Sequence, residues 1–324
     1  MRTARRPAVL PQSFAAILFP SIRISARPTA CGDMTITTST SLLDTTAYSV
    51  VIGSFIQSSP SFPSNDPAYD PLQDSFGLIN KSASRWDSFK RKIEQLNEES
   101  DENTAVKVIY LARHGQGYHN VAESNYGTKD WDDHWSKLNG DGQMVWGPDP
   151  LLTPLGINQA KRVNRAWKEQ QQDHVPLPQS LYSSPLSRAA STLDITWQDV
   201  LLGMETGVEP LFVEGLRETI GAHTCDKRKS KSYLASTYPS FTFEKGFAEE
   251  DELWSPTERE SDAEQAARIR SELNKIFATD ASQYISITAH GGVINAFFSV
   301  VGHRKVAVPP GGMIPIVQFW GELA

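Results

Sequence analysis

The chain has 324 residues, of which 39% are hydrophobic and 21% charged, and this is enough to bury a full α/β core. Its formal net charge of −7 argues against a surface for nucleic acid or anionic membranes, and no apolar run approaches the ~18 residues that a membrane-spanning helix needs. The two cysteines, Cys31 and Cys225, lie far apart in the sequence, which argues against a disulfide framework and fits a reducing compartment.

Residues 1–33 differ in composition from the rest of the chain. The first 32 residues contain five arginines and no acidic residue, which is typical of a mitochondrial transit peptide, but their prolines weaken an amphipathic helix. The alternative is that Met34 is the working start and that residues 1–33 are an upstream extension of the reading frame. We therefore expect a cytoplasmic location, with an additional nuclear location as an alternative and mitochondrial targeting as the less favoured one.

Residues 34–105 are expected to form an extension that packs on the main domain, residues 106–324. The part up to about residue 84 is rich in Ser, Thr and Pro, so it should wrap the domain surface. Ser84 is a candidate helix N-cap, and apolar residues follow it at spacings of three, four and three: Trp86, Phe89, Ile93 and Leu96. This pattern predicts an amphipathic helix of about three turns that docks on the domain.

The most informative stretch runs from Val106 to Asn120, with the sequence V-K-V-I-Y-L-A-R-H-G-Q-G-Y-H-N. Its apolar first half predicts a strand that is buried on both faces of a parallel sheet. The strand ends at Arg113, His114 and Gly115, and the ligand crevice of an open α/β sheet lies at the carboxyl ends of its strands. The alternative is a simple turn that carries Arg and His, so this motif needs support from other parts of the chain.

Residues 118–150 are expected to form an insertion without regular structure. Three tryptophans in it, Trp131, Trp135 and Trp146, argue against disorder, so we expect a wall of the active site. Thr153 and Pro154 then predict the N-cap and first residue of a helix that continues to about residue 172.

Two further predicted strands lead into a second arginine and a second histidine. Leu181–Ser184 is expected to be a strand, and the helix Leu186–Leu201 after it has Arg188 in its first turn, where free backbone N–H groups favour an anion. Tyr284–Thr288 is expected to be another strand, and it leads into His290. The alternation of strands and helices predicts an α/β fold.

A second insertion, at about residues 219–260, follows a strand predicted at Leu211–Leu216. It begins with the basic cluster Lys227, Arg228, Lys229 and Lys231. Charge runs are usually solvated faces, but this cluster follows Glu218 closely and could overhang the site. Arg228 would then bind a second acidic group of the substrate, because its planar fork can hold an oxyanion at two points.

Several of these motifs resemble the histidine phosphatase superfamily, also called phosphoglycerate mutase-like (branch 1). R-H-G stands after the first of the predicted core strands, S-S-P-x-x-R-A after the next, and H-G after Tyr284–Thr288. Four stretches are similar to the fungal phosphoglycerate mutase-like proteins: L-A-R-H-G-Q-G-Y-H-N, L-T-P-L-G, E-G-L-R-E-T-I-G-A-H-T-C-D and D-E-L-W. The resemblance implies a three-layer α/β/α sandwich with a mostly parallel central sheet.

The resemblance also implies phosphoryl transfer through a phosphohistidine. His114 would be the nucleophile, and Arg113, Arg188 and His290 would stabilise the charge on the transferring group. Glu218 would donate a proton to the leaving oxygen and then activate the attacking water. The residues expected to bind substrate are Asn120, Gln116, Arg228 and Gly291.

We therefore predict a metal-independent phosphomonoester hydrolase without a cofactor, acting on a small phosphorylated metabolite. The sequence has no H-E-x-x-H, P-loop or paired Asp motif, and the residue six after Cys225 is Lys231, where a cysteine phosphatase needs Arg. The alternatives are a phosphomutase, against which the continuation Gln116 to Asn120 argues, and a non-catalytic phosphate-binding module. Four of the other histidines are expected to be polar surface residues: His119, His134, His223 and His303. The predicted partner is the small substrate, with neither nucleic acid nor membrane, and the oligomeric state stays open.

Overall fold

A computed structural model of the chain describes residues 46–64, 69–101 and 103–322. The expectations for residues 1–33 and for a start at Met34 lie outside these residues, as does Cys31. The described residues form one compact unit. Within the described ranges, no helix combines the length and the apolar character needed to cross a membrane.

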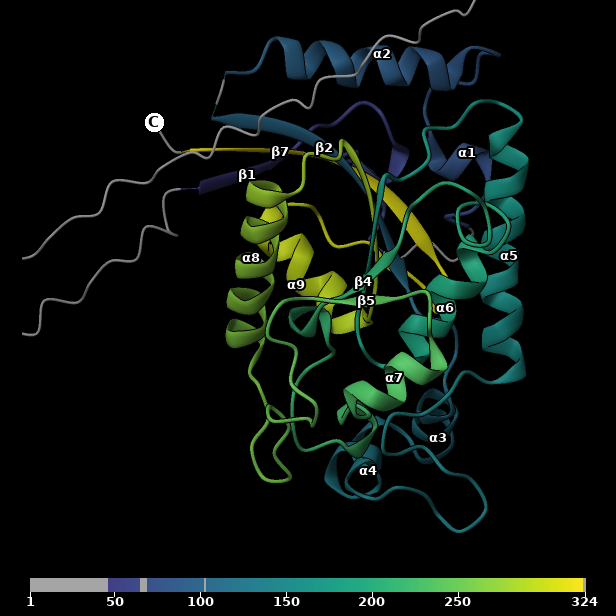
Figure 1. Ribbon diagram of the computed structural model, residues 1–324, viewed down its shortest axis with the longest axis vertical. Coiled ribbons are helices and arrows are strands. Elements are labelled where there is room, and N and C mark those ends of the chain that lie inside the picture. Colours follow the sequence, from purple (N-terminus) through teal and green to yellow (C-terminus); the bar gives the residue numbers. More distant parts are fainter. Residues whose placement is uncertain (1–45, 65–68, 102, 323–324) are drawn as a thin grey trace, which may run out of the picture. The chain divides into compact units, whose positions relative to one another are not determined.

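The described residues form a seven-stranded sheet in the order β1-β7-β2-β6-β3-β4-β5. Neighbouring strands are parallel, except that β7 runs antiparallel to both β1 and β2 (Figure 1). The strands are β1 Thr46–Val50, β2 Thr104–Arg113, β3 Ser180–Ser183, β4 Pro210–Phe212, β5 Thr242–Phe243, β6 Tyr284–Ala289 and β7 Met313–Glu322. The predicted α/β class with a mostly parallel sheet is confirmed.

Helices cover both faces of this sheet, as Figure 1 shows. One layer contains α2 (Arg85–Glu98), α5 (Pro154–Gln171) and α6 (Ser187–Trp197), and the other contains α8 (Asp262–Thr279) and α9 (Gly291–Val301). The remaining helices are α1 Asp74–Gly77, α3 Tyr118–Tyr126, α4 Thr128–Asp133 and α7 Lys231–Thr237, with 3-10 turns at Ile56–Ser58, Trp135–Lys137, Glu214–Leu216 and Thr224–Asp226.

Strand β2 divides the core because its side chains alternate between the two faces. Val108 and Tyr110 pack in the layer of α2, α5 and α6, whereas Ile109 and Leu111 pack in the layer of α8 and α9. Removing all four side chains from water anchors the strand firmly, since each fully buried large aliphatic or aromatic side chain contributes about 1.5–3 kcal/mol. Strand β2 is therefore a rigid support for whatever follows Arg113.

The N-terminal extension contributes to the sheet more than its composition predicted. It was expected to wrap the surface, but β1 is an edge strand paired with β7, and Phe55, Phe76 and Leu78 are buried in the core. The helix expected after Ser84 is confirmed as α2, which buries Trp86 among other apolar residues.

Both insertions contain regular structure that the sequence analysis did not predict. Residues 118–146 form α3, α4 and a 3-10 turn instead of an irregular loop, because Tyr126 stacks on Trp135 with ring centroids 4.1 Å apart and Trp131 and Trp146 are buried. In the second insertion, β5 extends the sheet beside β4. Strand β4 ends at Phe212, earlier than expected, and the chain then turns through 3-10 geometry into Leu216.

Candidate active site

The sheet register brings the predicted site residues to one edge. Arg113 at the end of β2 pairs with Ala289 at the end of β6, so His114 and His290 follow at the same level. Strand β3 lies on the other side of β6 and delivers Ser184 and the start of α6. A pocket of about 320 Å³ opens there, and its lining includes Arg113, His114, Asn120, Arg188 and Glu218.

His114 is a buried imidazole with a defined tautomer. Its Nδ1 lies 2.7 Å from the carbonyl oxygen of Gly115. A carbonyl can only accept, so Nδ1 carries the proton and Nε2 keeps its lone pair. Burial, followed by the charges of Arg188 and Arg113, holds the pKa of His114 well below its usual range. His114 is therefore a neutral imidazole whose Nε2 can act as a nucleophile.

The backbone after His114 approaches helix α5 very closely. A Cβ atom on Gly115 would lie 2.4 Å from the carbonyl oxygen of Gly156, which no side chain could tolerate. The Gly115 amide donates to Thr192 Oγ1 at 3.0 Å, and this bond fixes the turn against α6. The glycine of the R-H-G motif thus holds the nucleophile in place by permitting this contact.

His290 lies beside the nucleophile, with ring centroids 5.0 Å apart. Its Nε2 is 2.7 Å from Ser184 Oγ, so β3 orients the ring. Burial, then the charge of Arg188, lowers the pKa of His290 well below the usual value. His290 is thus also a neutral imidazole.

Arg188 is 1% exposed and is held by the second insertion. Its Nη1 donates to the carbonyl of Cys225 at 2.7 Å, and its Nη2 pairs with Asp226 Oδ1 at 2.9 Å. The first turn of α6 is in turn capped by Asp149, whose carboxylate accepts from Ser187 N at 2.8 Å and Ser187 Oγ at 2.6 Å. Because the N-cap residue, Leu186, has no side-chain oxygen, Asp149 supplies the cap from a distant loop. Asp149 was not identified from the sequence.

Arg113 packs against the start of α9. Its Nη1 donates to the carbonyl of Val308 at 3.1 Å, and a Cβ atom on Gly291 would lie 3.3 Å from its Cζ. The lining of the pocket includes Gly292 instead of the predicted Gly291. Gly291 therefore contributes space for the arginine instead of a contact with the substrate.

Glu218 is fixed in the pocket by backbone amides. Its Oε2 accepts from Gly292 N at 3.1 Å, and its Oε1 accepts from Thr219 N at 3.0 Å. A Cβ atom on Gly292 would lie 2.1 Å from Oε1, so the second glycine of the H-G-G sequence is required for this approach. These contacts hold the Glu218 carboxylate at the pocket lining.

The inner end of the pocket has an excess of donors. Two buried guanidinium nitrogens of this lining meet no acceptor within the described part of the chain: Arg113 Nε and Arg188 Nε. Buried polar groups are normally satisfied, so such a cluster calls for a further partner. A phosphoryl group would supply acceptor oxygens and compensate the two guanidinium charges.

Two residues that were expected to bind substrate differ in position: Asn120 lines the pocket and Gln116 does not. Asn120 lines the pocket, and its Oδ1 accepts from Gly117 N at 3.0 Å, which leaves its amide NH₂ as the donor. The Gln116 side chain instead accepts from Thr153 Oγ1 at 2.8 Å, outside the pocket lining. The expectation for Gln116 is wrong, because its side chain ties the R-H-G turn to the N-terminus of α5.

The expectation for Arg228 is also wrong. Its side chain is 1% exposed, and Nε donates to both oxygens of Glu214 at 2.9 Å. The Nη atoms donate to carbonyls of the neighbouring loop, and the guanidinium lies 4.4 Å from the Phe247 ring centroid. Every donor is used within the protein, so Arg228 holds the insertion together and does not reach the substrate.

The sequence analysis missed two histidines of the pocket. His119 and His223 line it, although both were expected at the surface. His303 is buried as well, between Ser58 and the carbonyl of Arg304, whereas His134 is exposed as expected. One feature of the sequence could have located His119, namely the start of a helix at this point. Asn120 stands three residues after Gly117, and its side-chain oxygen accepts a hydrogen bond from the Gly117 amide.

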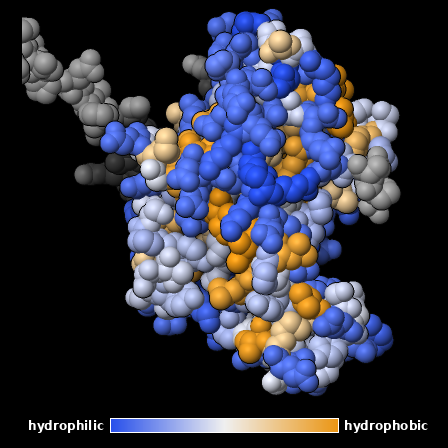
Figure 2. Space-filling model, turned by 90° about the vertical axis from the view of Figure 1, so that its right-hand side faces the viewer, coloured by the Kyte–Doolittle hydropathy of each residue, from blue (hydrophilic) through white to orange (hydrophobic). Residues whose placement is uncertain are grey.

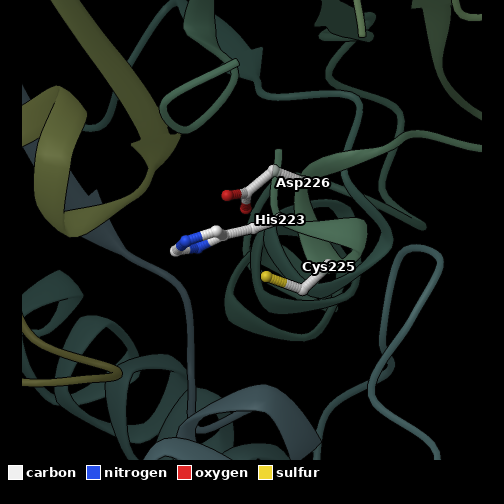
Figure 3. A group of neighbouring side chains, drawn as sticks. All are labelled: His223, Cys225 and Asp226. Atoms are coloured by element: carbon white, nitrogen blue, oxygen red, sulfur yellow. The ribbon is translucent and has the colours of Figure 1, made fainter. Parts of the chain in front are cut away.

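His223, Cys225 and Asp226 form a cluster with metal-ligand chemistry, shown in Figure 3. Their ligand atoms lie within 4.8 Å of one another. Asp226, however, already pairs with Arg188 at 2.9 Å and lies 3.5 Å from Arg259. A divalent cation would have to displace these guanidinium groups, and burial raises the pKa of the Cys225 thiol, which opposes ligation. The charge arrangement instead fits Asp226 as the residue that orients Arg188.

A larger pocket of about 570 Å³ lies beside this site, and its lining includes Tyr118, Met144, Val145 and Leu151. It is mainly apolar, and Val145 is 72% exposed. Figure 2 shows that hydrophobic groups on one face of the molecule lie in small clusters among hydrophilic ones. The smaller pocket is the candidate active site, because the titratable residues converge there.

The buried histidines should make folding stability depend on pH. Burial, then Arg188, lowers the pKa of His114, His119 and His290 well below 6.5. In the unfolded chain they titrate near their ordinary pKa of about 6.5. Above that pH the histidines are neutral in both states, and their contribution to the free energy of unfolding is complete. Below it the unfolded state binds more protons than the folded state. The free energy of unfolding therefore falls, by up to about 1.4 kcal/mol for each histidine and each pH unit.

Urea unfolding at pH 7.5 and 5.5 measures this loss. His290→Asn should lose less stability between the two pH values than the wild type does. His134→Asn, at an exposed position, should match the wild type. Equal losses in all three proteins would contradict the assignment of buried neutral imidazoles.

The model of the histidine phosphatase superfamily (branch 1) matches residues 109–308. The chain is 42% identical to a probable phosphoglycerate mutase of Arthroderma benhamiae over 284 residues, which cover 84% of both chains. It is 37% identical over 222 residues to a probable phosphoglycerate mutase of Saccharomyces cerevisiae, covering 63% of this chain and 75% of that one.

Among solved structures, the chain is similar to a mycobacterial glucosyl-3-phosphoglycerate phosphatase. The TM-score is 0.38 and the sequence identity 21%, with 65% of this chain and 92% of that chain covered. The match of the family model and the identity to the curated relatives show that the chain belongs to branch 1 of the histidine phosphatase superfamily, which includes phosphatases and mutases.

Proposed function

We propose that this protein is a metal-independent phosphomonoester hydrolase that acts through a phosphohistidine at His114. The observation that carries the proposal is the state of His114, which is neutral, donates its Nδ1 proton to the Gly115 carbonyl, and lines one pocket with Arg113 and Arg188. A lone pair on Nε2 is what an in-line attack on phosphorus requires.

The reaction consists of two displacements. In the first, His114 Nε2 forms a bond to phosphorus while the bond from phosphorus to the leaving oxygen breaks, and Glu218 donates a proton to that oxygen. In the second, Glu218 takes a proton from water as the water oxygen attacks phosphorus, and the P–N bond breaks to release inorganic phosphate. The first displacement leaves His114 phosphorylated and Glu218 deprotonated, and the second returns both residues to their starting states, with His114 neutral and Glu218 protonated.

The surrounding residues stabilise the charge that develops on the phosphoryl oxygens. The protein acceptors of Arg113 and Arg188 bind their Nη atoms. The Nε atom of each arginine has no acceptor in the part of the chain that is described. His290 is fixed by Ser184 and places a second neutral ring 5.0 Å from that of His114. Such preorganised donors stabilise a transition state without having to reorient.

The outer part of the pocket favours hydrolysis of substrates with one acidic group. The lining includes Glu123 and Asp132, called the rim carboxylates below, and Arg259 is the one cation of the described lining besides Arg113 and Arg188. A phosphoglycerate mutase must hold a carboxylate in addition to the phosphate, and like charges at the rim oppose this. The two carboxylates therefore favour a substrate whose leaving group is uncharged or cationic.

The test is a panel of phosphomonoesters measured in the presence of a chelator. We expect kcat/KM for glycerol 3-phosphate or ethanolamine phosphate to exceed that for 3-phosphoglycerate by at least about tenfold, since two rim carboxylates oppose the extra charge. The double change Glu123→Gln and Asp132→Asn should narrow this ratio several-fold, whereas Lys129→Gln, an exposed control on the same helix as Asp132, should not. Activity lost with chelator and restored by Mg²⁺ or Zn²⁺ would contradict the metal-independent mechanism.

The second candidate function is a phosphomutase, because the relatives from Arthroderma benhamiae and Saccharomyces cerevisiae are named probable phosphoglycerate mutases. The same assay separates the two functions. A mutase moves the phosphoryl group between positions of phosphoglycerate and releases little inorganic phosphate, whereas the proposed hydrolase releases one phosphate per turnover.

A further inference from the structure

A third imidazole, His119, lies at the reacting end of the pocket and has no role in the mechanism above. Its ring centroid is 5.4 Å from that of His114, and the residue is 8% exposed although it lines the pocket. Helix α3 begins at Tyr118, so its first turn carries His119.

The sequence before His119 is adapted to this position. A Cβ atom on Gly117 would lie 2.6 Å from His119 Nδ1 and 2.7 Å from Cε1, so the Nδ1–Cε1 edge of the ring packs directly on the glycine. The Gly117 amide is held by Asn120 Oδ1 at 3.0 Å. Because that edge is closed by the backbone, the side of the ring that lines the pocket is the Nε2–Cδ2 edge.

The environment also selects a tautomer. No acceptor or donor of the described chain meets the buried Nδ1 atom. A buried N–H without an acceptor is costlier than an unused lone pair, so Nδ1 carries the lone pair and Nε2 carries the proton. Burial, then the charges of Arg188 and the neighbouring imidazole of His114, holds the pKa of His119 well below its usual range. The ring is thus a neutral donor that points its N–H into the pocket.

We propose that His119 is a further catalytic residue, whose Nε2–H donates a hydrogen bond to a non-bridging phosphoryl oxygen as phosphorus transfers to His114 Nε2. This inference rests on the proposed function, because the acceptor is the transferring group. A histidine with only a packing role would find partners for both nitrogens within the protein, as His303 does with Ser58 and Arg304. The hydrogen bond strengthens as charge develops on the oxygen, so it stabilises the transition state more than the bound substrate.

The test compares His119→Phe, which keeps a ring and removes the donor, with His119→Gln, which keeps an N–H. We expect the rate of phosphoenzyme formation in a single turnover to fall about 100-fold in the Phe variant and about tenfold or less in the Gln variant. Orthovanadate, which imitates the five-coordinate transition state, should lose affinity by a similar factor, and inorganic phosphate should lose less than about threefold. His134→Phe, at an exposed position nearby in the chain, is the matched control and should behave as the wild type.

The outcomes separate this inference from the proposed function. A wild-type protein that turns substrate over without forming a phosphoenzyme would overturn the proposed function itself. A normal phosphoenzyme in the wild type together with an unchanged rate in the Phe variant would overturn the role of His119 alone. Equal losses of phosphate and vanadate affinity would assign His119 to ground-state binding and also overturn it. If the Phe variant does not fold, His119→Ala decides in the same way, because it also lacks a donor and its small side chain cannot clash with Gly117.

Discussion

Replacing His114 with alanine should lower kcat/KM by at least ~10³-fold, the effect expected when a covalent nucleophile is removed. Neither of the other imidazoles can substitute for it. His290 has its Nε2 committed to Ser184 Oγ at 2.7 Å, and the Nδ1 edge of His119 is closed by Gly117. Water must then attack the phosphomonoester directly, without the intermediate that divides hydrolysis into two easier steps.

The control for this variant is binding of inorganic phosphate. Arg113 and Arg188 keep their partners when the imidazole is removed, because those partners are Val308, Cys225 and Asp226. Phosphate should therefore still bind the His114→Ala protein, and its melting temperature should stay within a few degrees of the wild type. A variant that keeps even one-tenth of the activity would exclude His114 as the nucleophile.

Replacing Asp251 with alanine should lower the free energy of unfolding by about 3–5 kcal/mol, the usual cost of breaking a buried ion pair from one side. The side chains of Arg217 and Asp251 are 0% and 1% exposed and are joined by hydrogen bonds of 2.7 and 2.6 Å. Asp251 also accepts from the amides of Arg228 and Trp254. Burial pushes the pKa of Asp251 up, but the hydrogen bond and charge of Arg217 hold it below its ordinary value, so the carboxylate is charged.

Urea unfolding measures this loss, with Asp133→Ala as the matched control. Asp133 pairs with Lys129 on the surface of α4, and such exposed pairs contribute about 0–1 kcal/mol. The Asp251 variant should also bind phosphate more weakly, because Arg217 Nη2 donates to the carbonyl of Asp226, the partner of Arg188. A loss below about 1 kcal/mol would mean that Glu214 alone can compensate the buried guanidinium group of Arg217.

The site residues at strand ends could be predicted from the sequence. Arg113, His114 and His290 each follow an apolar run, and the pattern of the run fixes both the strand and the edge at which it ends. The sequence alone could not show that β2 and β6 are neighbours. The carboxyl ends of parallel strands nevertheless lie at the same edge of a sheet, whether or not the strands are neighbours. The prediction therefore did not depend on the strand order.

Residues positioned by helices in the insertions could not be predicted in the same way. His119 was missed because residues 118–146 lack a clear apolar stripe, and their aromatic side chains pack on one another instead of on the sheet. Asp149 caps α6 from 38 residues away, and Arg228 is satisfied by carbonyls about 20 residues further along the chain. Such long-range contacts to backbone groups leave no trace in residue spacing.

Strand β7 was missed for a different reason. Pro315 interrupts the apolar run Met313–Glu322, and a proline in a run argues against a central strand. The pairing resolves this conflict, because β1 covers only Gln318 to Glu322, so β7 has β2 alone as its partner strand at Pro315. A missing N–H costs little where one side of the strand is unpaired.

The most direct test of the mechanism is to identify the phosphorylated residue. Wild-type protein is mixed with a ³²P-labelled phosphomonoester, quenched within milliseconds and digested, and the labelled peptide is sequenced. The mechanism predicts an acid-labile, alkali-stable phosphate on His114 that forms no more slowly than steady-state turnover. Label on a serine, on Cys225 or on an aspartate, or turnover with no phosphoenzyme at any time, would contradict it.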